Sequence, residues 1–345
     1  MAPAPPLRFA VVGVNHAHIY AQTNLLLRAG AELAAFHAAE PDLAAEFAAR
    51  YPQARQVAER RAILEDDRIQ LVVSAAIPCE RAPLGVEAMR HGKDYMSDKP
   101  AVTTREQLAE VRRVQAETGR IFSVCFSERF ENAATVQAGE LVRAGAIGRV
   151  VQTVGLGPHR ISAPSRPAWF FDRAKYGGIL ADIAAHQADQ FLFFTGSTEA
   201  EVVAAQVANW NFPQWPEFED FGEMLVRWNG GTGYVRVDWY TPDGLPTWGD
   251  GRLTILGTEG YIELRKYVDI AGRSGGDHLF LVDGAGMRHL DCGGRDLPYG
   301  RQLVADVVDR TETAMPQAHC FLACQLVLEA EAVAARLGHL RDGRR

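Results

Sequence analysis

A turn near the start of the chain has the residue types of a phosphate-binding loop. An apolar run begins at Leu7 and leads into Gly13, Asn15 and His18. In the fingerprint G-x-G-x-x-G, the glycines allow a tight turn, so that helix N–H groups can bind the pyrophosphate of a dinucleotide. Gly13 matches the first position, Asn15 tolerates left-handed backbone angles at the second, and His18 replaces the third glycine. The turn therefore predicts a dinucleotide site, and a loop that has lost its ligand is the alternative.

The end of the second expected strand bears on which dinucleotide binds. Residues 35–40 contain His37 and Glu40, but no acid at the usual ribose-binding position and no Arg or Lys that could meet a 2′-phosphate. NAD is therefore favoured over NADP, but His37 and Glu40 leave binding of either dinucleotide possible.

A lysine follows the expected strand Asp94–Ser97, within the sequence Asp98-Lys99-Pro100. Open α/β sheets bind ligands outside the carboxyl ends of their strands, so Lys99 lies where a catalytic cation would act. The alternative is a solvated turn residue, which is the more common role of a lysine at the end of a strand.

A third group of reactive residues lies on one expected helix, Leu180–Phe194, which follows two glycines. At 100° per residue, Asp182, His186 and Asp189 share one sector of this helix, and apolar residues occupy the opposite side. An imidazole one turn from a carboxylate suits proton transfer, because the acid can orient the ring. A polar, solvated helix face is the alternative.

The elements that must position these residues alternate between short β-branched runs and helical stretches. The expected strands are Leu7–Val14, Ala31–Phe36, Gln70–Ala76, Asp94–Ser97 and Arg120–Phe126, and the expected helices are Ala17–Ala29, Asp42–Arg50, Arg81–His91 and Arg105–Thr118. This alternation predicts an α/β fold with a doubly wound parallel sheet, a dinucleotide-binding Rossmann domain over residues 1–127.

The remaining chain changes to longer strands joined by Gly-rich turns. The expected strands are Val150–Gly155, Ala200–Trp210, Gly222–Trp228, Gly233–Tyr240, Leu253–Leu256 and Tyr261–Leu264, and the expected helices are Ala133–Arg143, Leu180–Phe194 and Ala318–Leu337. This pattern predicts a C-terminal α/β domain over residues 128–345 with a large, mainly antiparallel open sheet. Because such a sheet leaves one face to be covered, we expect this domain to form a homodimer or homotetramer. We also expect this second domain to hold the substrate.

Composition excludes several classes of partner. The formal charge is −7 and no basic cluster appears before the last few residues, which argues against nucleic acid. No stretch has the length of a membrane span and no signal peptide is recognisable, so we expect a cytoplasmic location and no membrane partner. The five scattered cysteines fit reduced thiols. No metal is expected, since His319, Cys320 and Cys324 match no standard zinc spacing.

The three motifs, in this order and at these separations, resemble the glucose-fructose oxidoreductase and inositol dehydrogenase family, often called Gfo/Idh/MocA. Its signals are a Rossmann start, a Glu-Lys-Pro after the fourth strand, and a Gly-Gly turn leading to an Asp, a His four residues on and another Asp. The matching residues are Asp98-Lys99-Pro100, Gly177-Gly178, Asp182, His186 and Asp189, with residues 126–130 resembling the interdomain linker and residues 144–150 the next signature. The resemblance covers nearly the whole chain. The chain departs from the family in its glycine loop, in the missing ribose acid, and at Ala82, where the family often has a His.

The resemblance implies an NAD(P)-dependent oxidoreductase that transfers a hydride between the nicotinamide and a hydroxyl-bearing carbon of a sugar, cyclic polyol or sugar derivative. It implies that Lys99 binds the substrate hydroxyl and assists proton transfer, that His186 is the acid/base, and that Asp182 orients substrate and base. Residues expected to contact the dinucleotide are Gly13, Val14, Asn15, His16, His37, Ala76, Pro78, Asp98, Lys99 and Ser127, and those expected to contact the substrate are Arg129, His159 and Trp169.

Two further functions fit the same fold. Some members of the family retain NAD and cleave a glycosidic bond through transient oxidation of the sugar, as a glycosidase or lyase. A non-enzymatic sensor of sugar or dinucleotide is the other alternative, suggested by the altered glycine loop.

Overall fold

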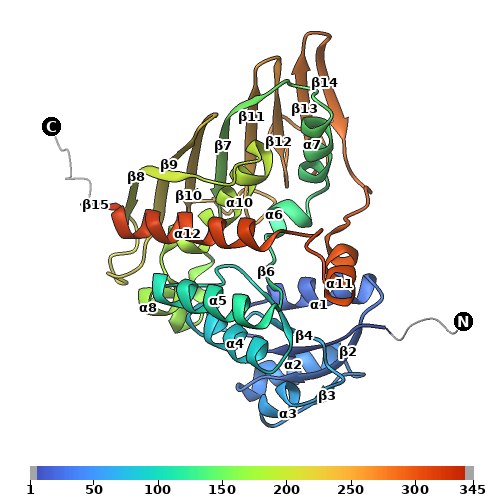
Figure 1. Cartoon of the computed structure of the whole chain (residues 1–345). Helices are drawn as coiled ribbons and strands as arrows, with labels where there is room; N and C mark the ends of the chain where they lie inside the picture. The colour runs from blue at the N-terminus through green and yellow to red at the C-terminus, as the bar shows by residue number, and fades with distance from the viewer. Residues whose placement is uncertain (1–5, 339–345) are drawn as a thin grey trace, which may run out of the picture. The chain divides into compact units, whose positions relative to one another are not determined.

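The computed structural model describes residues 6–338 and divides them into two compact units (Figure 1). The first unit comprises the described residues up to Cys125 together with Pro298–Phe321. The second comprises Phe126–Leu297 and the described residues from Leu322 onward. The predicted division at residue 127 therefore lies within two residues of the first crossing between units, but it omits the return of the chain to the first unit.

Six parallel strands form the sheet of the first unit, in the order β3-β2-β1-β4-β5-β6. The strands are β1 Arg8–Val12, β2 Glu32–His37, β3 Arg55–Gln56, β4 Leu71–Ser74, β5 Asp94–Ser97 and β6 Phe122–Val124, and the helices are α1 His18–Arg28, α2 Pro41–Arg50, α3 Arg61–Leu64, α4 Pro78–Arg90 and α5 Arg105–Thr118. Every residue of β4 and β5 is buried, as expected when helices cover both faces of a parallel sheet. The predicted Rossmann-type sheet is confirmed, and its strand order reverses between β1 and β4, where such sheets bind ligands.

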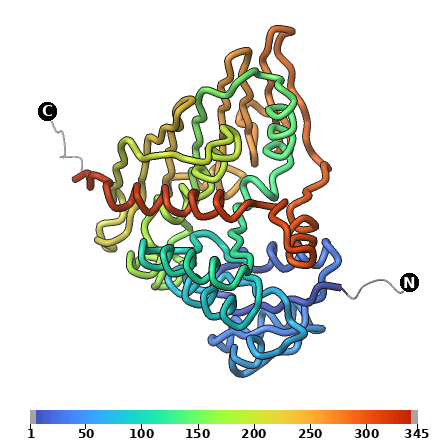
Figure 2. The backbone as a smooth tube through the Cα atoms, in the orientation of Figure 1, coloured from blue at the N-terminus to red at the C-terminus, as the bar shows by residue number. Residues whose placement is uncertain are grey.

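Helix α11, Tyr299–Asp309, is the part of the chain that returns to the first unit, where it packs beside α1 (Figure 2). The hydroxyls of Tyr299 and Ser123 lie 2.8 Å apart. Arg310 donates two hydrogen bonds, of 2.8 and 3.0 Å, to the buried carboxylate of Asp94. These contacts attach a late segment of the sequence to strands β5 and β6.

Nine strands form the sheet of the second unit, in the order β14-β13-β12-β11-β7-β10-β9-β8-β15. They are β7 Val150–Pro158, β8 Glu201–Ala208, β9 Phe221–Trp228, β10 Gly231–Asp238, β11 Arg252–Gly257, β12 Gly260–Arg265, β13 His278–Asp283, β14 Gly286–Asp291 and β15 Ala335–Leu337. Neighbours are antiparallel except for the pairs β7–β10 and β8–β15. The predicted mainly antiparallel sheet is confirmed.

Helices of the second unit cover one face of this sheet. They are α6 Ser127–Phe130, α7 Ala133–Arg143, α8 Arg173–Tyr176, α9 Ile179–Asp182, α10 Ala184–Thr195 and α12 Gln317–Val333, the last of which begins in the first unit. Figure 1 shows α7 and α10 in front of the strands against which they pack. Gly155 on β7 permits this packing, because a Cβ there would lie 2.5 Å from Oε1 of Gln187 on α10.

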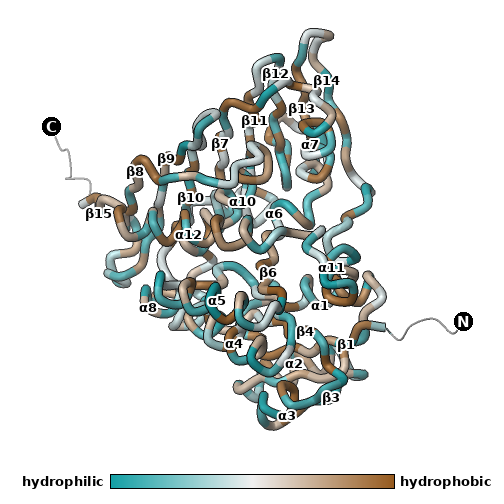
Figure 3. Tube along the Cα trace, viewed as in Figure 1, coloured by the Kyte–Doolittle hydropathy of each residue, from teal (hydrophilic) through white to brown (hydrophobic). Residues whose placement is uncertain are grey.

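Two of the predicted helices are wrong in extent. The segment Leu180–Phe194 is interrupted at Ile183, which separates α9 from α10. The helix predicted over Ala318–Leu337 ends at Val333. Figure 3 shows the apolar character of the helix that forms, α12. Its last three predicted residues instead form β15, which pairs with residues 206–208 of β8. The open edge of β8 offers unpaired backbone groups, and this tertiary pairing overrides a modest helix propensity.

In the part of the chain from residue 6 to residue 338, the search for helices long and apolar enough to cross a membrane finds none.

Candidate active site in two parts

The turn between β1 and α1 depends on a close approach between backbone segments. Gly13 has a φ of +81°, and a Cβ at this position would lie 2.5 Å from the Cβ of Ala76, which follows β4. The Gly13 N–H donates to the carbonyl of His37 at 3.0 Å, and the His16 N–H donates to the carbonyl of Ala75 at 3.0 Å. Val14 lies inside this turn and is buried. The turn thus lies at the point where the strand order reverses, as a dinucleotide site requires.

The first turn of α1 contains no acid, so the helix brings no negative charge of its own against an anion at its start. Its first N–H groups bond locally: His18 donates to Nδ1 of His16 at 3.3 Å, Ile19 to the His16 carbonyl at 3.1 Å and Tyr20 to the Ala17 carbonyl at 3.2 Å. Asn15, in place of the second glycine, donates from Nδ2 to Oε1 of Glu40 at 2.7 Å. Glu40 directly precedes α2, so a carboxylate does lie beside the turn despite its absence from the usual position.

Asp98 is the centre of a buried polar cluster at the end of β5. One of its oxygens lies 3.0 Å from Nδ1 of His18 and accepts a hydrogen bond of 3.1 Å from Gln22. The other oxygen lies 3.2 Å from Nη2 of Arg81. Burial alone would raise the pKa of Asp98, but the charges of His18 and Arg81 hold it well below its usual range. The histidine that replaces the third glycine is therefore paired with an ionised carboxylate.

Arg81 organises the loop that carries the candidate catalytic lysine. Its side chain is 1% exposed and donates to the carbonyls of Ala76 at 2.7 Å, Lys99 at 2.5 Å and Pro100 at 3.1 Å. Together with its ion pair to Asp98, these bonds connect the ends of β4 and β5. Lys99 itself is 6% exposed.

His16, His18 and Asp98 also present ligand atoms that all lie within 4.8 Å of one another, the spacing of a metal centre. The positive charges of Arg81 and Lys99 act on the same cluster, and burial together with His18 lowers the pKa of His16 well below its usual value. The positive charges of Arg81 and Lys99 would repel a metal ion bound at this cluster. We therefore interpret the cluster as part of an anion-binding turn.

The predicted proton-transfer residues lie in the second unit. Asp182 is the last residue of α9, and His186 lies in the first turn of α10, where it is 2% exposed. The ring of Phe126 meets His186 edge to face, with 6.4 Å between centroids. Burial lowers the pKa of the Arg166 guanidinium, and the charge of Asp182 opposes this shift.

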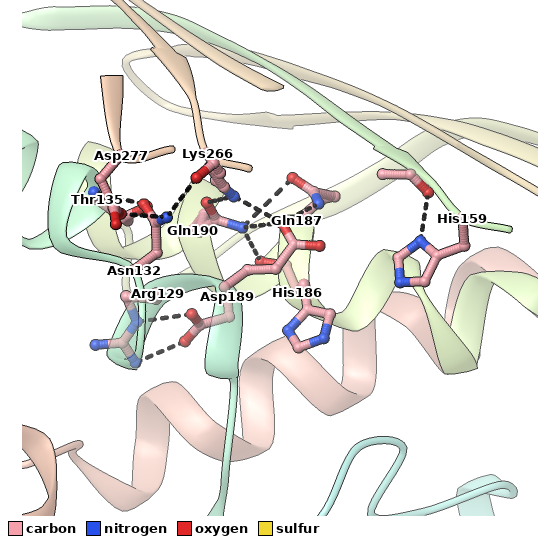
Figure 4. Close-up of polar contacts among 12 residues, drawn as sticks. Arg129, Asn132, Thr135, His159, His186, Gln187, Asp189, Gln190, Lys266 and Asp277 are labelled. Atoms are coloured by element: carbon pink, nitrogen blue, oxygen red, sulfur yellow. Dashed lines mark hydrogen bonds and ion pairs between the residues drawn. The ribbon is translucent and has the colours of Figure 1, made fainter. Parts of the chain in front are cut away.

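A fully buried charge network connects α10 to α6 and to the end of β12 (Figure 4). Lys266 donates from Nζ to Glu128 at 2.6 Å and to Gln190 at 2.5 Å, and Gln187 donates to Glu128 at 2.9 Å. Burial would raise the pKa of Glu128, but Lys266 and His186 lower it to about 2. Glu128 is therefore ionised at neutral pH and links α6 to α10.

The structure gives Arg129 partners other than the predicted substrate. It donates from Nε and Nη2 to the two carboxylate oxygens of Asp189, at 2.6 and 2.7 Å. Its guanidinium also lies over the rings of Phe130 and Phe193, at 4.0 and 4.9 Å from their centroids. Two-point pairing with a buried acid leaves it poorly placed to contact a sugar, and Figure 4 shows both side chains turned toward each other. The contact between Arg129 and a substrate stays a prediction, to which the structure adds a structural role, the pairing with Asp189.

Aromatic rings form a continuous group around the other two predicted substrate residues. His159 lies 4.5 Å from the ring of Trp248 and 5.4 Å from that of Trp239. Trp169 contacts Phe170, whose ring lies 5.2 Å from Trp239. Sugars commonly present apolar C–H faces to such rings, so this group suits a polyhydroxylated ligand.

The remaining predicted contacts are divided between the units. His37 ends β2, with Nδ1 lying 3.2 Å from the carbonyl of Val57, and Pro78 begins α4. Ser127 begins α6 in the second unit. Sequence reasoning missed Arg81, Arg166 and Glu128, because an isolated Arg or Glu gives no signal of a partner that is distant in the sequence.

The fold thus combines a Rossmann unit that carries a candidate dinucleotide turn with a second unit that carries an open sheet and an Asp–His pair on α9 and α10. Residues 7–126 match the family model described as an oxidoreductase family with an NAD-binding Rossmann fold, and residues 135–263 match that of the GFO/IDH/MocA C-terminal domain. The chain therefore belongs to the Gfo/Idh/MocA family, and its first unit is the NAD-binding Rossmann domain of that family.

Individual relatives agree with this assignment. The chain is 29% identical over 198 residues to levoglucosan dehydrogenase of Pseudarthrobacter phenanthrenivorans, covering 56% of this chain and 50% of that protein. It is 26% identical over 228 residues to scyllo-inositol 2-dehydrogenase (NAD(+)) of Bacillus subtilis, covering 64% of each. The matched segment thus spans between half and two thirds of these curated relatives. A crystal structure of an oxidoreductase of unestablished activity from Erwinia carotovora atroseptica is 46% identical, with a TM-score of 0.94, and covers 96% of this chain and 100% of that one.

Proposed function

We propose that the protein is an NAD(P)-dependent oxidoreductase that transfers a hydride between nicotinamide and a hydroxyl-bearing carbon of a sugar, cyclic polyol or sugar derivative. The observation that carries this proposal is the Gly13 turn, which combines close backbone approach with the buried Asp98–Arg81 cluster and the adjacent Lys99. A binding turn with a catalytic residue type at the neighbouring strand end is what a dinucleotide-dependent dehydrogenase requires.

The cofactor is NAD. Gly13, Val14, Asn15 and His16 would hold its pyrophosphate at the start of α1, and Glu40 would meet the ribose hydroxyls. The bound dinucleotide supplies the hydride acceptor or donor. Because the Glu40 carboxylate would repel a 2′-phosphate, this residue favours NAD over NADP.

The chain's own polar residues supply the proton chemistry. Removal of a hydride from a secondary alcohol requires its hydroxyl proton to leave, and a cation near the oxygen stabilises the developing alkoxide. Lys99 would provide that cation, His186 would take or return the proton, and Asp182 would orient the substrate and the base.

The aromatic group supports a sugar or polyol as the substrate. His159 and Trp169 would contact the ligand, and the guanidinium of Arg166, stacked 4.4 Å from the Phe170 ring centroid, adds a donor close to Asp182. The relatives that act on levoglucosan and scyllo-inositol are consistent with this class of substrate.

The assembly and location proposed with this function are a cytoplasmic homodimer or homotetramer. Large apolar side chains are exposed on the nine-stranded sheet, including Val203, Leu256, Tyr261 and Met287, of which Met287 is 80% exposed. A second copy could cover such a surface.

The test begins with titration of the purified protein with NADH and NADPH, followed by fluorescence and native mass spectrometry. We expect NADH to bind more tightly, and a panel containing levoglucosan and inositols to show reduction of NAD. Lys99→Ala should abolish turnover. Failure to bind either dinucleotide, in folded protein that carries none from purification, would overturn the proposal. Cleavage of a glycoside without net redox change would replace it with the glycosidase function.

A further inference from the structure

Two carboxylates from distant segments converge on the start of α9. Glu219, just before β9, accepts a hydrogen bond from the Ile179 N–H at 2.9 Å. Glu331, on the C-terminal helix α12, accepts hydrogen bonds from the N–H groups of Leu180 at 2.8 Å and Ala181 at 3.3 Å. The first three amides of this helix are therefore bound by two acids that are not part of it.

Helix α9 is too short to hold its own conformation. It has four residues, and short isolated helices are marginal in water because nucleation is costly and the first N–H groups lack partners. Gly178 precedes it with a φ of +103°, and a Cβ at this position would overlap the Glu331 carboxylate. The glycine thus lets the acid approach the amides directly.

Charged and polar groups surround these two acids. Arg173 on α8 donates to Glu219 at 3.0 Å and to Glu331 at 2.6 Å, and Arg336 on β15 donates to Glu219 at 2.9 Å. Tyr176, also on α8, accepts from the Glu219 N–H at 3.0 Å. The side chains of Glu219 and Glu331 are 1% and 6% exposed, so this cluster is paired but largely removed from water.

We propose that Glu331, acting with Glu219, is a positioning residue that holds α9 in place and thereby sets the position of Asp182 at its end. This inference rests on the proposed function in assigning Asp182 to the substrate. The C-terminal helix α12 thus supports the candidate active site although none of its residues is assigned to the chemistry.

A negative charge at a helix N-terminus is favourable in itself, but Glu331 is also buried beside the second acid Glu219, which disfavours its ionised form. Burial and the charge of Glu219 raise the pKa of Glu331 to about 7, with Arg173 opposing them. Because this pKa lies above the ordinary value of a carboxyl, the docked state of α9 is most stable with Glu331 protonated, so α9 should loosen and turnover should decline as the pH rises through about 7.

The experiment compares Glu331→Ala and Glu331→Gln with Glu329→Ala. Glu329 lies on the same helix and accepts a hydrogen bond of 2.7 Å from Gln325, which makes it a matched control. Amide hydrogen exchange of the segment 177–186 is measured on the full chain without substrate, and kcat, KM and their pH profiles are measured with NAD and the best substrate.

We expect Glu331→Ala to exchange at least tenfold faster in this segment and to lose at least tenfold in kcat, with an unchanged dissociation constant for NADH. Glu331→Gln keeps one acceptor oxygen and resembles the neutral acid, so it should recover most of kcat and lose the decline in activity as the pH rises through about 7. Glu329→Ala should behave as the unmodified protein.

The exchange measurement separates this inference from the proposed function. If no sugar is turned over but Glu331→Ala still loosens residues 177–186, the support of α9 stands and the dehydrogenase assignment fails. Unchanged exchange in Glu331→Ala would overturn the positioning role, and so would a kcat equal to that of Glu329→Ala in an active enzyme.

Discussion

The dinucleotide turn of the first unit and the Asp–His helices of the second unit reach their geometry by different means. At the turn, Gly13 and Ala76 bring two backbone segments together with little side chain between them. On the helix that carries His186, a network that includes Glu128 and Lys266 fixes α10 through fully buried charges. A bound cofactor brings its own reactive group, so a close backbone approach suffices, whereas proton transfer by side chains needs those side chains held in place.

This contrast predicts different consequences for substitutions in the two units. Added side-chain volume should impair the dinucleotide turn of the first unit. Loss of a charged side chain should impair the Asp–His helices of the second unit. Lys99 is the exception, since it is the residue of the first unit that we assign to chemistry.

Lys99→Met should have the largest effect on turnover. Loss of a group that stabilises charge and assists proton transfer costs roughly 10²- to 10⁴-fold in rate. Steady-state kinetics should show this loss in kcat, while NADH titration should give a dissociation constant within about threefold of the original. Lys175→Met is the control, because that side chain is 49% exposed. Equal kcat values for the two variants would exclude Lys99 from the chemistry.

Arg129→Met should mainly reduce stability. Removing one partner of a buried ion pair leaves the Asp189 carboxylate uncompensated, at a cost of about 3–5 kcal/mol in the free energy of unfolding. Urea denaturation measures this value, with Arg227→Met as the control, since the Arg227–Glu201 pair is more than half exposed and should contribute less than about 1 kcal/mol. If Arg129→Met instead raised the KM for the substrate without loss of stability, Arg129 would be assigned to substrate binding.

Gly13→Ala should weaken dinucleotide binding by about ten- to a hundredfold, equivalent to about 1.4–2.7 kcal/mol. The added methyl group would collide with Ala76, and a φ of +81° is unfavourable for alanine. Gly30→Ala is a close control, because Gly30 has a φ of +86° but no atom within 4 Å of the added Cβ. NADH fluorescence titration would contradict the steric argument if both variants bound equally well.

Glu40→Gln should have the smallest effect, a severalfold shift of preference toward NADPH. The substitution removes the negative charge beside the expected 2′ position but keeps a hydrogen-bonding group next to Asn15. The ratio of dissociation constants for NADPH and NADH measures this shift, and Glu46→Gln, on the helix α2 that Glu40 precedes, is the control. An unchanged ratio would mean that Glu40 does not face the ribose.

Local signals in the sequence predicted the reactive residue types and many of the regular elements, but not β13, β14, β15 or α11. The boundaries of β5, α5 and α7 agree with their predictions to the residue, because hydrophobic periodicity and caps such as Thr104 and Asn132 are local signals. The ordered motifs around Lys99, Asp182 and His186 were sufficient to identify the family.

The partners of these residues follow from the tertiary fold. Arg81 reaches Lys99, Arg129 pairs with Asp189, and Glu331 binds the amides of α9. It also decided that residues 335–337 pair with β8 as a strand. Periodicity reports which face of an element is apolar, but it carries no information about which distant charge or open strand edge the folded chain brings beside it.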